Sequence, residues 1–241
     1  MRVALVTGAN TGIGWAIARR LQSDGFALAF HTRDEKQESQ ERFTEIAKSG
    51  AAHWLTGDVG EPDVGERLVG EAVEALGGID VLVNNAGATV RRPVLEFDAE
   101  DFEQIFSVDV RGAFLLSTAA ARRMRDQEGG SIVNVTSVHE HVPRPGFALY
   151  AGAKAALGMI TRGLALELAE HGIRVNAVAP GAIATERNRE EDALVERIPF
   201  QRMGEPEEVA AVVSFLASDE ASYVTGASYL VDGGFVQRVL A

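Results

Sequence analysis

The chain contains no cysteine and has no excess of positive charge. Without cysteine, a disulfide scaffold and a thiolate zinc site are both excluded. The formal net charge is −12, which disfavours nucleic acid and anionic membrane surfaces as partners. The composition therefore favours small molecules over polyanions as ligands.

Long apolar runs and targeting signals are also missing. No run approaches the roughly 20 apolar residues that a membrane-spanning helix needs, and Met1 leads directly into a strand-like segment rather than a signal peptide. We therefore expect a cytoplasmic protein. The 241 residues, 46% of them hydrophobic, suffice for one well-packed domain, and residues 1–241 show no linker, repeat or low-complexity tract.

Apolar strand-like runs alternate with helical patterns along the whole chain. Strands are expected near residues 2–6, 26–30, 52–56, 79–84, 131–136, 173–178 and 228–231. Helices are expected near residues 13–23, 34–49, 62–76, 99–125, 149–171 and 205–217. This alternation predicts an α/β fold: a Rossmann-type, doubly wound sheet of seven parallel strands with helices on both faces.

Three glycine-containing motifs each follow a predicted strand. TGANTGIG (7–14) comes first, NNAG (84–87) follows a later strand, and Pro-Gly (180–181) follows another. In the first motif, Gly8 permits a tight turn, Gly12 a close approach to a pyrophosphate, and Gly14 close helix–strand packing. Because parallel strands end at one edge of a sheet, these motifs predict a dinucleotide site there. An ordinary glycine-rich turn is the alternative for the first motif alone.

Tyr150 and Lys154 lie four residues apart in YAGAK, with Ser137 upstream. That spacing is about one helical turn, so the phenol and the ammonium share a face. A fixed cation stabilises a phenolate, and a serine hydroxyl can hold a carbonyl oxygen beside the phenol. The three side chains would exchange a proton with an oxygen while a hydride is transferred at the adjacent carbon.

The motifs TGANTGIG, NNAG, YAGAK, VNAVAPG and VDGG, with Ser137, occur in an order and spacing that resemble the short-chain dehydrogenases/reductases. The resemblance covers essentially the whole chain. Within the family, SVHEHVPRPGFALYAGAK, PGAIATERN and EASYVTG are most similar to bacterial glucose 1-dehydrogenases. The 3-oxoacyl-carrier-protein reductases are the next resemblance, although Glu128 and His171 stand where basic docking residues for an acidic carrier protein would be expected.

The resemblance implies specific roles. Tyr150 matches the general acid/base, Lys154 the residue that activates the tyrosine and binds the nicotinamide ribose, and Ser137 the residue that orients the substrate oxygen. The implied cofactor contacts are Gly8, Asn10, Thr11, Gly12, Ile13, Gly14, Thr32, Arg33, Asp58, Val59, Asn85, Ala86, Gly87, Tyr150, Lys154, Pro180, Gly181, Ile183 and Thr185.

One position departs from the family pattern. Asp109 stands where the family usually has an asparagine that holds a water in a proton relay. An aspartate retains the main-chain carbonyl but adds a charge and loses the amide donor. We include Asp109 in the catalytic set and expect activity to survive.

The cofactor preference depends on the end of the second strand, at Thr32 and Arg33. Thr32 occupies the position that carries an acid in NAD-dependent relatives, whereas Arg33 suits the 2′-phosphate of NADP(H). NADP(H) is therefore favoured, with NAD(H) possible. Arg33 as ordinary surface charge is the alternative.

The substrate end of the site is less well specified. Residues 182–203 form a long polar segment that we expect to close over the substrate. Thr89, Arg91 and Arg92 follow NNAG and are expected near the mouth of the site. His139 is expected to line the pocket. The sequence His-Glu-His at 139–141 does not predict a metal site, since no third ligand is positioned.

The proposed activity is hydride transfer between a nicotinamide and a carbonyl or secondary alcohol. A hydrolase based on Ser137 is disfavoured, because no G-x-S-x-G motif is present. A cofactor-binding sensor or scaffold without turnover is the remaining alternative, favoured only by Asp109.

The helix expected near Leu149–Glu170 carries Ala, Leu and Gly on several faces, which is more apolar surface than one core face requires. The resemblance to the family implies a homotetramer.

Overall fold

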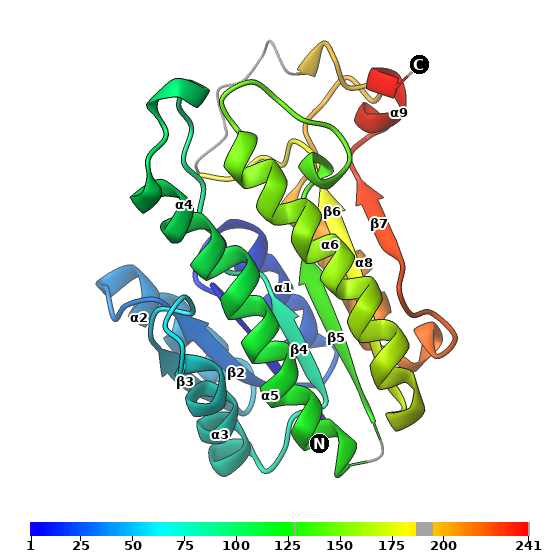
Figure 1. Ribbon diagram of the computed structural model, residues 1–241. Coiled ribbons are helices and arrows are strands. Elements are labelled where there is room, and N and C mark those ends of the chain that lie inside the picture. The colour runs from blue at the N-terminus through cyan, green and yellow to red at the C-terminus, as the bar shows by residue number, and fades with distance from the viewer. Residues whose placement is uncertain (128, 187–194, 241) are drawn as a thin grey trace.

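Seven parallel strands form one sheet in the computed structural model, which describes residues 1–127, 129–186 and 195–240 (Figure 1). Their order across the sheet is β3-β2-β1-β4-β5-β6-β7. The strands are β1 Val3–Val6, β2 Ala27–Thr32, β3 Ala52–Thr56, β4 Val81–Asn84, β5 Gly130–Val135, β6 Ile173–Pro180 and β7 Ser228–Val231. The predicted doubly wound α/β sheet is confirmed, and all seven predicted strands are found.

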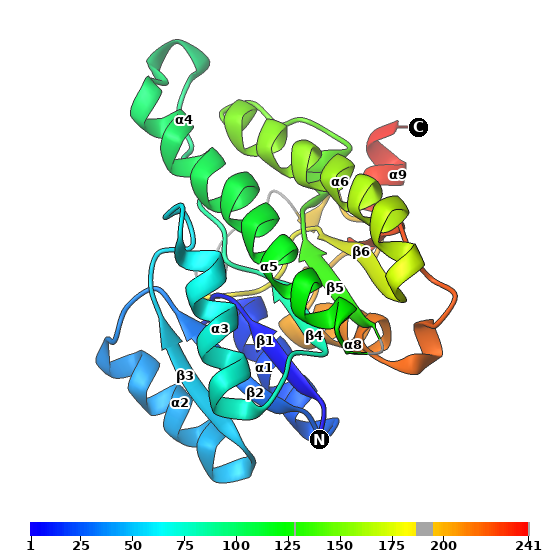
Figure 2. The same cartoon turned by 60° about the horizontal axis from the view of Figure 1, so that its bottom comes forward.

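Helices cover both faces of this sheet. The α-helices are α1 Gly12–Ser23, α2 Gln37–Ser49, α3 Val64–Leu76, α4 Ala99–Phe106, α5 Ala113–Arg125, α6 Ala148–Leu168, α8 Pro206–Ala217 and α9 Phe235–Leu240. Helices α3, α5 and α6 lie on one face, while α1 and α8 lie on the other (Figures 1 and 2). No helix in the described part of the chain is long and apolar enough to span a membrane.

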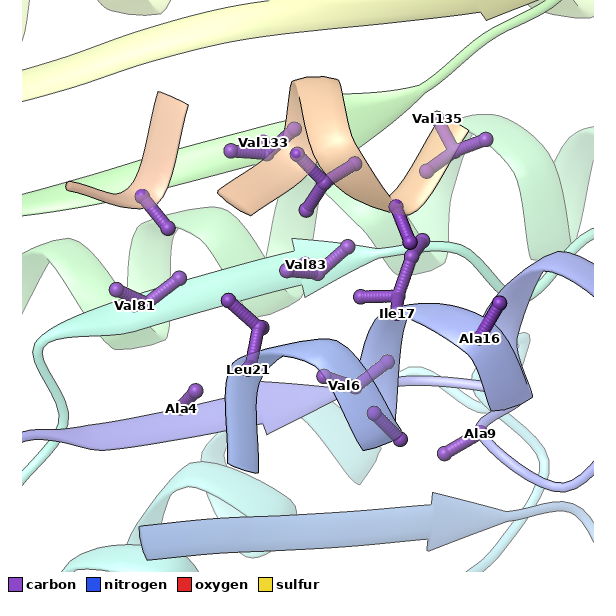
Figure 3. Packing of buried hydrophobic residues seen from close by; sticks show 14 of the residues in the cluster. Ala4, Val6, Ala9, Ala16, Ile17, Leu21, Val81, Val83, Val133 and Val135 are labelled. Atoms are coloured by element: carbon purple, nitrogen blue, oxygen red, sulfur yellow. The ribbon is translucent and has the colours of Figure 1, made fainter. Parts of the chain in front are cut away.

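Each face of the sheet has its own apolar core. On the face of α1 and α8, alternate strand residues pack against apolar helix residues, as Figure 3 shows for Val6, Val83 and Ile17. On the other face, Leu5 and Leu82 pack among residues of α3 and α5. Strands buried on both faces need continuous apolar runs, which is why the strand segments lack polar alternation. Each fully buried Leu or Val contributes roughly 1.5–3 kcal/mol.

A row of four aromatic rings crosses one end of the fold. Trp15 of α1 meets Phe30 of β2, Phe30 meets Phe43 of α2, and Phe43 stacks on Trp54 of β3. The centroid separations are 6.4, 5.9 and 5.4 Å. The row fixes α1 and α2 against the first half of the sheet.

The helix expected over residues 99–125 is not continuous. A π-helical segment, Ser107–Gly112, separates α4 from α5. Such a segment inserts an extra residue per turn and is frequent at functional sites. Here it carries Asp109, which is 1% exposed. The sequence pattern could not locate this break, because the apolar spacing on either side remains compatible with one helix.

Candidate active site

The first two glycine motifs lie side by side at the carboxyl edge of the sheet, where β1 and β4 are neighbours. The Asn85 side chain donates to the carbonyl oxygens of Thr7 and Gly8, at 2.9 and 3.1 Å. The Thr7 hydroxyl accepts from the main-chain N–H groups of Asn85 and Ala86, both at 3.0 Å. Strand order reverses between β1 and β4, which is where ligands bind in doubly wound sheets.

The glycine loop leaves an open cradle before α1. Gly8 has φ +62°, which non-glycine residues seldom adopt. A Cβ on Gly14 would overlap the Gly8 carbonyl oxygen, so the helix can approach the loop this closely only with glycine. Thr11 is the N-cap of α1 but makes no side-chain cap bond, and the first turn holds no acid. The helix amides and their positive dipole end therefore fit a pyrophosphate.

The remaining residues expected around the dinucleotide surround this cradle. Asn10 is anchored by a 3.0 Å bond from its amide to the Ser39 hydroxyl. Thr185, which follows β6, packs beside Gly12, since a Cβ there would lie 3.1 Å from the Thr185 methyl. Ile183 forms a bridge with Gly204. Three further residues occupy neighbouring strand ends or the first helical turn, namely Ile13, Pro180 and Gly181.

The residues expected around the adenosine lie beyond β2 and β3. Arg33 and Asp58 form an ion pair of 3.0 Å, with 77% of the Arg33 side chain exposed. Val59 beside Asp58 is buried. Thr32 is fully buried: its hydroxyl donates to the Asp34 carbonyl at 2.8 Å and accepts from the Trp54 indole at 2.9 Å. Both hydrogen bonds of the Thr32 hydroxyl are thus made within the chain, and the cofactor contact expected of this residue stays a prediction.

Tyr150 and Lys154 lie on α6, and Ser137 follows β5. The Lys154 ammonium lies 5.6 Å from the centroid of the Tyr150 ring. The Ser137 hydroxyl accepts from the His139 main-chain N–H at 3.2 Å, and only 7% of Ser137 is exposed. The strand end and the first turns of α6 thus bring the three residues of the proton-exchange set to one edge of the sheet.

Lys154 is buried and paired with Asp109. Its Nζ lies 2.7 Å from Asp109 Oδ1 and donates to the Val135 carbonyl at 3.1 Å. Burial opposes the charged form, but Asp109, then Tyr150 and Glu140, outweigh it and raise the pKa of Lys154. The other Asp109 oxygen accepts from the Ala88 N–H at 2.7 Å. A Cβ on Gly87 would approach Asp109 Oδ1 to 3.0 Å, so the pair lies directly behind NNAG.

His139 forms an aromatic wall next to Tyr150. Its ring stacks on Phe147 at 5.5 Å and meets Tyr150 edge-on at 6.0 Å. Burial lowers the pKa of His139, so the ring is neutral at neutral pH and Nδ1 donates to the Val142 carbonyl at 2.9 Å. The Nε2 atom then carries a lone pair and can accept a hydrogen bond.

Two guanidinium groups flank the same wall. Arg91 and Arg144 lie 5.6 and 5.3 Å from the centroid of the Phe147 ring. Thr89 is exposed beside them, whereas Arg92 is paired with Asp101 at 3.0 Å. Residues 187–194, part of the segment 182–203 that was expected to close over the substrate, lie outside the described residues. Glu128, considered above as a docking position for a carrier protein, also lies outside them.

No group of three or more metal-ligating side chains occurs among the residues that the structure describes. His139 is bonded to the main chain, and His141 pairs with Glu140 at 2.9 Å.

The burial of the Glu140 carboxylate was not anticipated from the sequence. Its side chain is 3% exposed and lies against Gly158 of α6, where an added Cβ would meet Glu140 Oε2 at 3.1 Å.

Comparison with known proteins agrees with this geometry. A family profile described as enoyl-(acyl carrier protein) reductase matches residues 8–236. Glucose 1-dehydrogenase of Gluconobacter oxydans is 41% identical, with 95% of this chain and 90% of the relative covered. A 3-oxoacyl-[acyl-carrier-protein] reductase of Synechocystis is 39% identical, with 98% and 97% covered.

A solved structure is equally similar. The crystal structure of acetoin dehydrogenase from Enterobacter cloacae is 42% identical in sequence and superposes with a TM-score of 0.92. The match covers 98% of this chain and 96% of the acetoin dehydrogenase chain. The resemblance to glucose 1-dehydrogenases and ketoacyl reductases expected from the sequence is thereby confirmed. The chain is a member of the short-chain dehydrogenase/reductase family of oxidoreductases, which use NAD(P).

Proposed function

We propose that the protein transfers hydride between a nicotinamide dinucleotide and a small carbonyl or secondary-alcohol substrate, using Ser137, Tyr150 and Lys154. The observation that carries the proposal is the position of Tyr150 beside the buried Lys154 ammonium, which in turn lies next to Gly87 of the second glycine motif. The bound dinucleotide supplies or accepts the hydride.

In the reductive direction, the Ser137 hydroxyl orients the carbonyl oxygen towards the phenol. Tyr150 gives its proton to that oxygen as the carbon receives the hydride, and the product is a secondary alcohol. Lys154 keeps a positive charge beside the phenol, which eases loss of the proton. In the oxidative direction, the same phenol oxygen accepts the alcohol proton.

NADP(H) is the favoured cofactor in this proposal. Arg33 is largely exposed and is held at the adenosine end by Asp58. A guanidinium there suits a 2′-phosphate, because its planar fork of N–H groups can donate two hydrogen bonds to phosphate oxygens at once. Position 32 holds a buried threonine rather than an acid, so this position supplies no carboxylate for a ribose 2′-hydroxyl.

The substrate is proposed to be small and oxygen-rich. The His139 and Phe147 rings line one side of the site, with Arg91 and Arg144 beyond them. The neutral His139 accepts a substrate hydroxyl through Nε2. Proteins of 39–42% identity are named for glucose, for 3-oxoacyl-[acyl-carrier-protein] and for acetoin, and their similarity to this chain does not rank these three substrates.

The test is turnover by the wild-type protein with NADPH and NADH separately, against sugars, diketones and acetoacetyl esters. Tyr150→Phe should lower kcat by about 10²–10⁴-fold with little change in cofactor affinity. Tyr223→Phe, at a fully exposed tyrosine, is the matched control and should retain wild-type rates. Undiminished turnover in Tyr150→Phe would exclude this mechanism.

A sensor or scaffold that binds the cofactor without turnover is the second candidate. The one observation in its favour is Asp109, which ties up Lys154 in a direct ion pair. Tight cofactor binding by the wild type, with no turnover on any compound of the panel, would establish this alternative.

A homotetramer is proposed as the assembly. Apolar side chains on α4, α5 and α6 stand exposed in the single chain, including Phe102, Phe114, Met159 and Leu166. Monomers seldom expose a large apolar patch, whereas symmetric interfaces bury one. Light scattering at micromolar concentration should give about four times the 25.7 kDa chain mass; a monomer mass would refute the tetramer.

A further inference from the structure

His31, near the end of β2, is a buried histidine whose two ring nitrogens both have partners. It is 1% exposed. The Gly8 main-chain N–H donates to Nδ1 at 3.3 Å, and Nε2 lies 3.0 Å from the Gly57 carbonyl oxygen. Only the neutral ring with its proton on Nε2 satisfies both contacts, because Nδ1 must accept while Nε2 donates.

These two contacts connect loops that follow different strands. Gly8 opens the glycine cradle after β1, and Gly57 follows β3 immediately before Asp58. His31 lies on β2, the strand between them (Figure 1). Its carbonyl oxygen also accepts from the Ala9 N–H at 2.9 Å. One residue therefore holds the loop proposed for the pyrophosphate and the loop proposed for the adenine.

We propose that His31 is a positioning residue for the dinucleotide, setting the separation of its pyrophosphate loop and its adenosine loop. The inference rests on the proposed cofactor site but goes beyond it, since His31 itself is buried beneath both loops. A preformed site binds more tightly because less ordering is needed on binding. His31 thus acts on cofactor affinity and leaves the proton exchange at Tyr150 unchanged.

The surroundings keep this ring neutral. Burial lowers the pKa of His31 to about 4; the bond to Gly57 and the Asp58 carboxylate oppose the shift, and the Arg67 guanidinium adds to it. Arg67 itself is bound to the Thr56 carbonyl at 3.1 Å. A protonated ring would place an N–H against the Gly8 N–H. Cofactor affinity is therefore constant near neutral pH and falls only as the solution approaches pH 4.

Two amide substitutions separate the two contacts of the ring. In His31→Asn, the short side chain places its oxygen near the position of Nδ1 and can still accept from Gly8. In His31→Gln, the longer side chain reaches towards Gly57 instead. His31→Leu removes both contacts with similar volume. His53→Gln, on the adjacent strand β3, is the matched control.

The measurement is the Kd for NADPH and for NADH by fluorescence titration at pH 7, with kcat at saturating cofactor and the Tm of each variant. We expect His31→Leu to raise both Kd values by about tenfold, the effect of losing one or two neutral hydrogen bonds. His31→Asn and His31→Gln each keep one contact and should raise Kd less than His31→Leu does, while kcat should stay within about twofold of wild type.

Unchanged Kd values in His31→Leu would overturn the inference. If His31→Leu does not fold, the Asn and Gln variants decide: wild-type affinity in both would also overturn it. A Kd rise that tracks the Tm and is matched in kcat would show a purely structural role. A wild-type protein that binds neither dinucleotide would instead refute the proposed function, so the two failures are distinguishable.

Discussion

The carboxylate of Asp109 and the ammonium of Lys154 form a 2.7 Å ion pair in which both residues are at least 97% buried. The pair joins the π-helical segment to α6, although the two residues are 45 positions apart in the chain. The ammonium proposed to assist Tyr150 is thus partly neutralised by a carboxylate of the same chain.

Replacing Asp109 by Asn tests the importance of that charge. Lys154 would keep the Val135 carbonyl but lose its counter-ion, so we expect the free energy of unfolding to fall by about 3 kcal/mol. Turnover should persist within about tenfold at pH 7. Because Asp109 is the main group that offsets the burial of the ammonium, its loss should lower the pKa of Lys154, and kcat should decline at a lower alkaline pH than in the wild type. Urea titration and kcat between pH 5 and pH 10 provide the measurements. An inactive wild type restored by Asp109→Asn would contradict this account.

Cofactor preference is tested at Arg33. We expect Arg33→Ala to raise the KM for NADPH by about tenfold, the cost of one charge-assisted contact at an exposed site, and to leave the KM for NADH unchanged. Arg20→Ala is a suitable control, because Arg20 of α1 pairs with Asp24, the residue that caps the C-terminus of the same helix. Equal effects on both cofactors, or none on either, would count against NADP(H).

The cradle is tested by a pair of glycine substitutions. Gly14→Ala places a methyl group against the Gly8 carbonyl, so cofactor binding should be lost or weakened by at least about 100-fold. Gly70→Ala is the matched control: it lies in α3 with no atom within 4 Å of the added Cβ. It should raise the free energy of unfolding by about 0.5–1 kcal/mol and leave binding intact. Equivalent behaviour of the two variants would be inconsistent with a closely packed cradle.

The acid stability of the protein should depend on His31. Its pKa in the folded state is about 4, below the ordinary value of 6.5, so the unfolded chain binds a proton in that interval and the folded chain does not. Stability therefore falls as the pH drops from 6.5 to 4, by up to about 1.4 kcal/mol per pH unit. Lys154 does not change the free energy of unfolding in this pH interval, because its raised pKa lies in the alkaline range.

Unfolding titrations of the wild type and of His31→Asn at several pH values measure this term. The difference in free energy between the two proteins should shrink steadily as the pH is lowered through the interval. Parallel curves would show that the ring does not remain neutral when the chain is folded.

Much of the fold followed from sequence because strands buried on both faces must be apolar throughout, and the glycine motifs mark where those strands end. The partners of individual polar side chains did not follow. For example, the hydrogen bond from the Trp54 indole to the Thr32 hydroxyl, 22 residues apart in the chain, was not predicted. The Asp109–Lys154 pair depends on one turn of π-helix, which no periodicity reveals.

The residues that support the site could not be identified from sequence patterns either. His31 follows the apolar run Ala27–Phe30 within β2, and that polar residue in a buried strand was the only available signal. Glu140 was noted only as the middle of a His-Glu-His sequence, although its carboxylate is buried against α6. Such roles depend on distances between elements, and sequence spacing specifies distances only within one element.

The aromatic row has an optical consequence. The chain has two tryptophans, and both belong to that row. All intrinsic indole emission therefore originates in the half of the molecule that holds the proposed dinucleotide cradle, and none originates around Tyr150. Fluorescence of the unlabelled protein will report the arrival of the nucleotide, while events confined to the substrate pocket will pass without a direct signal.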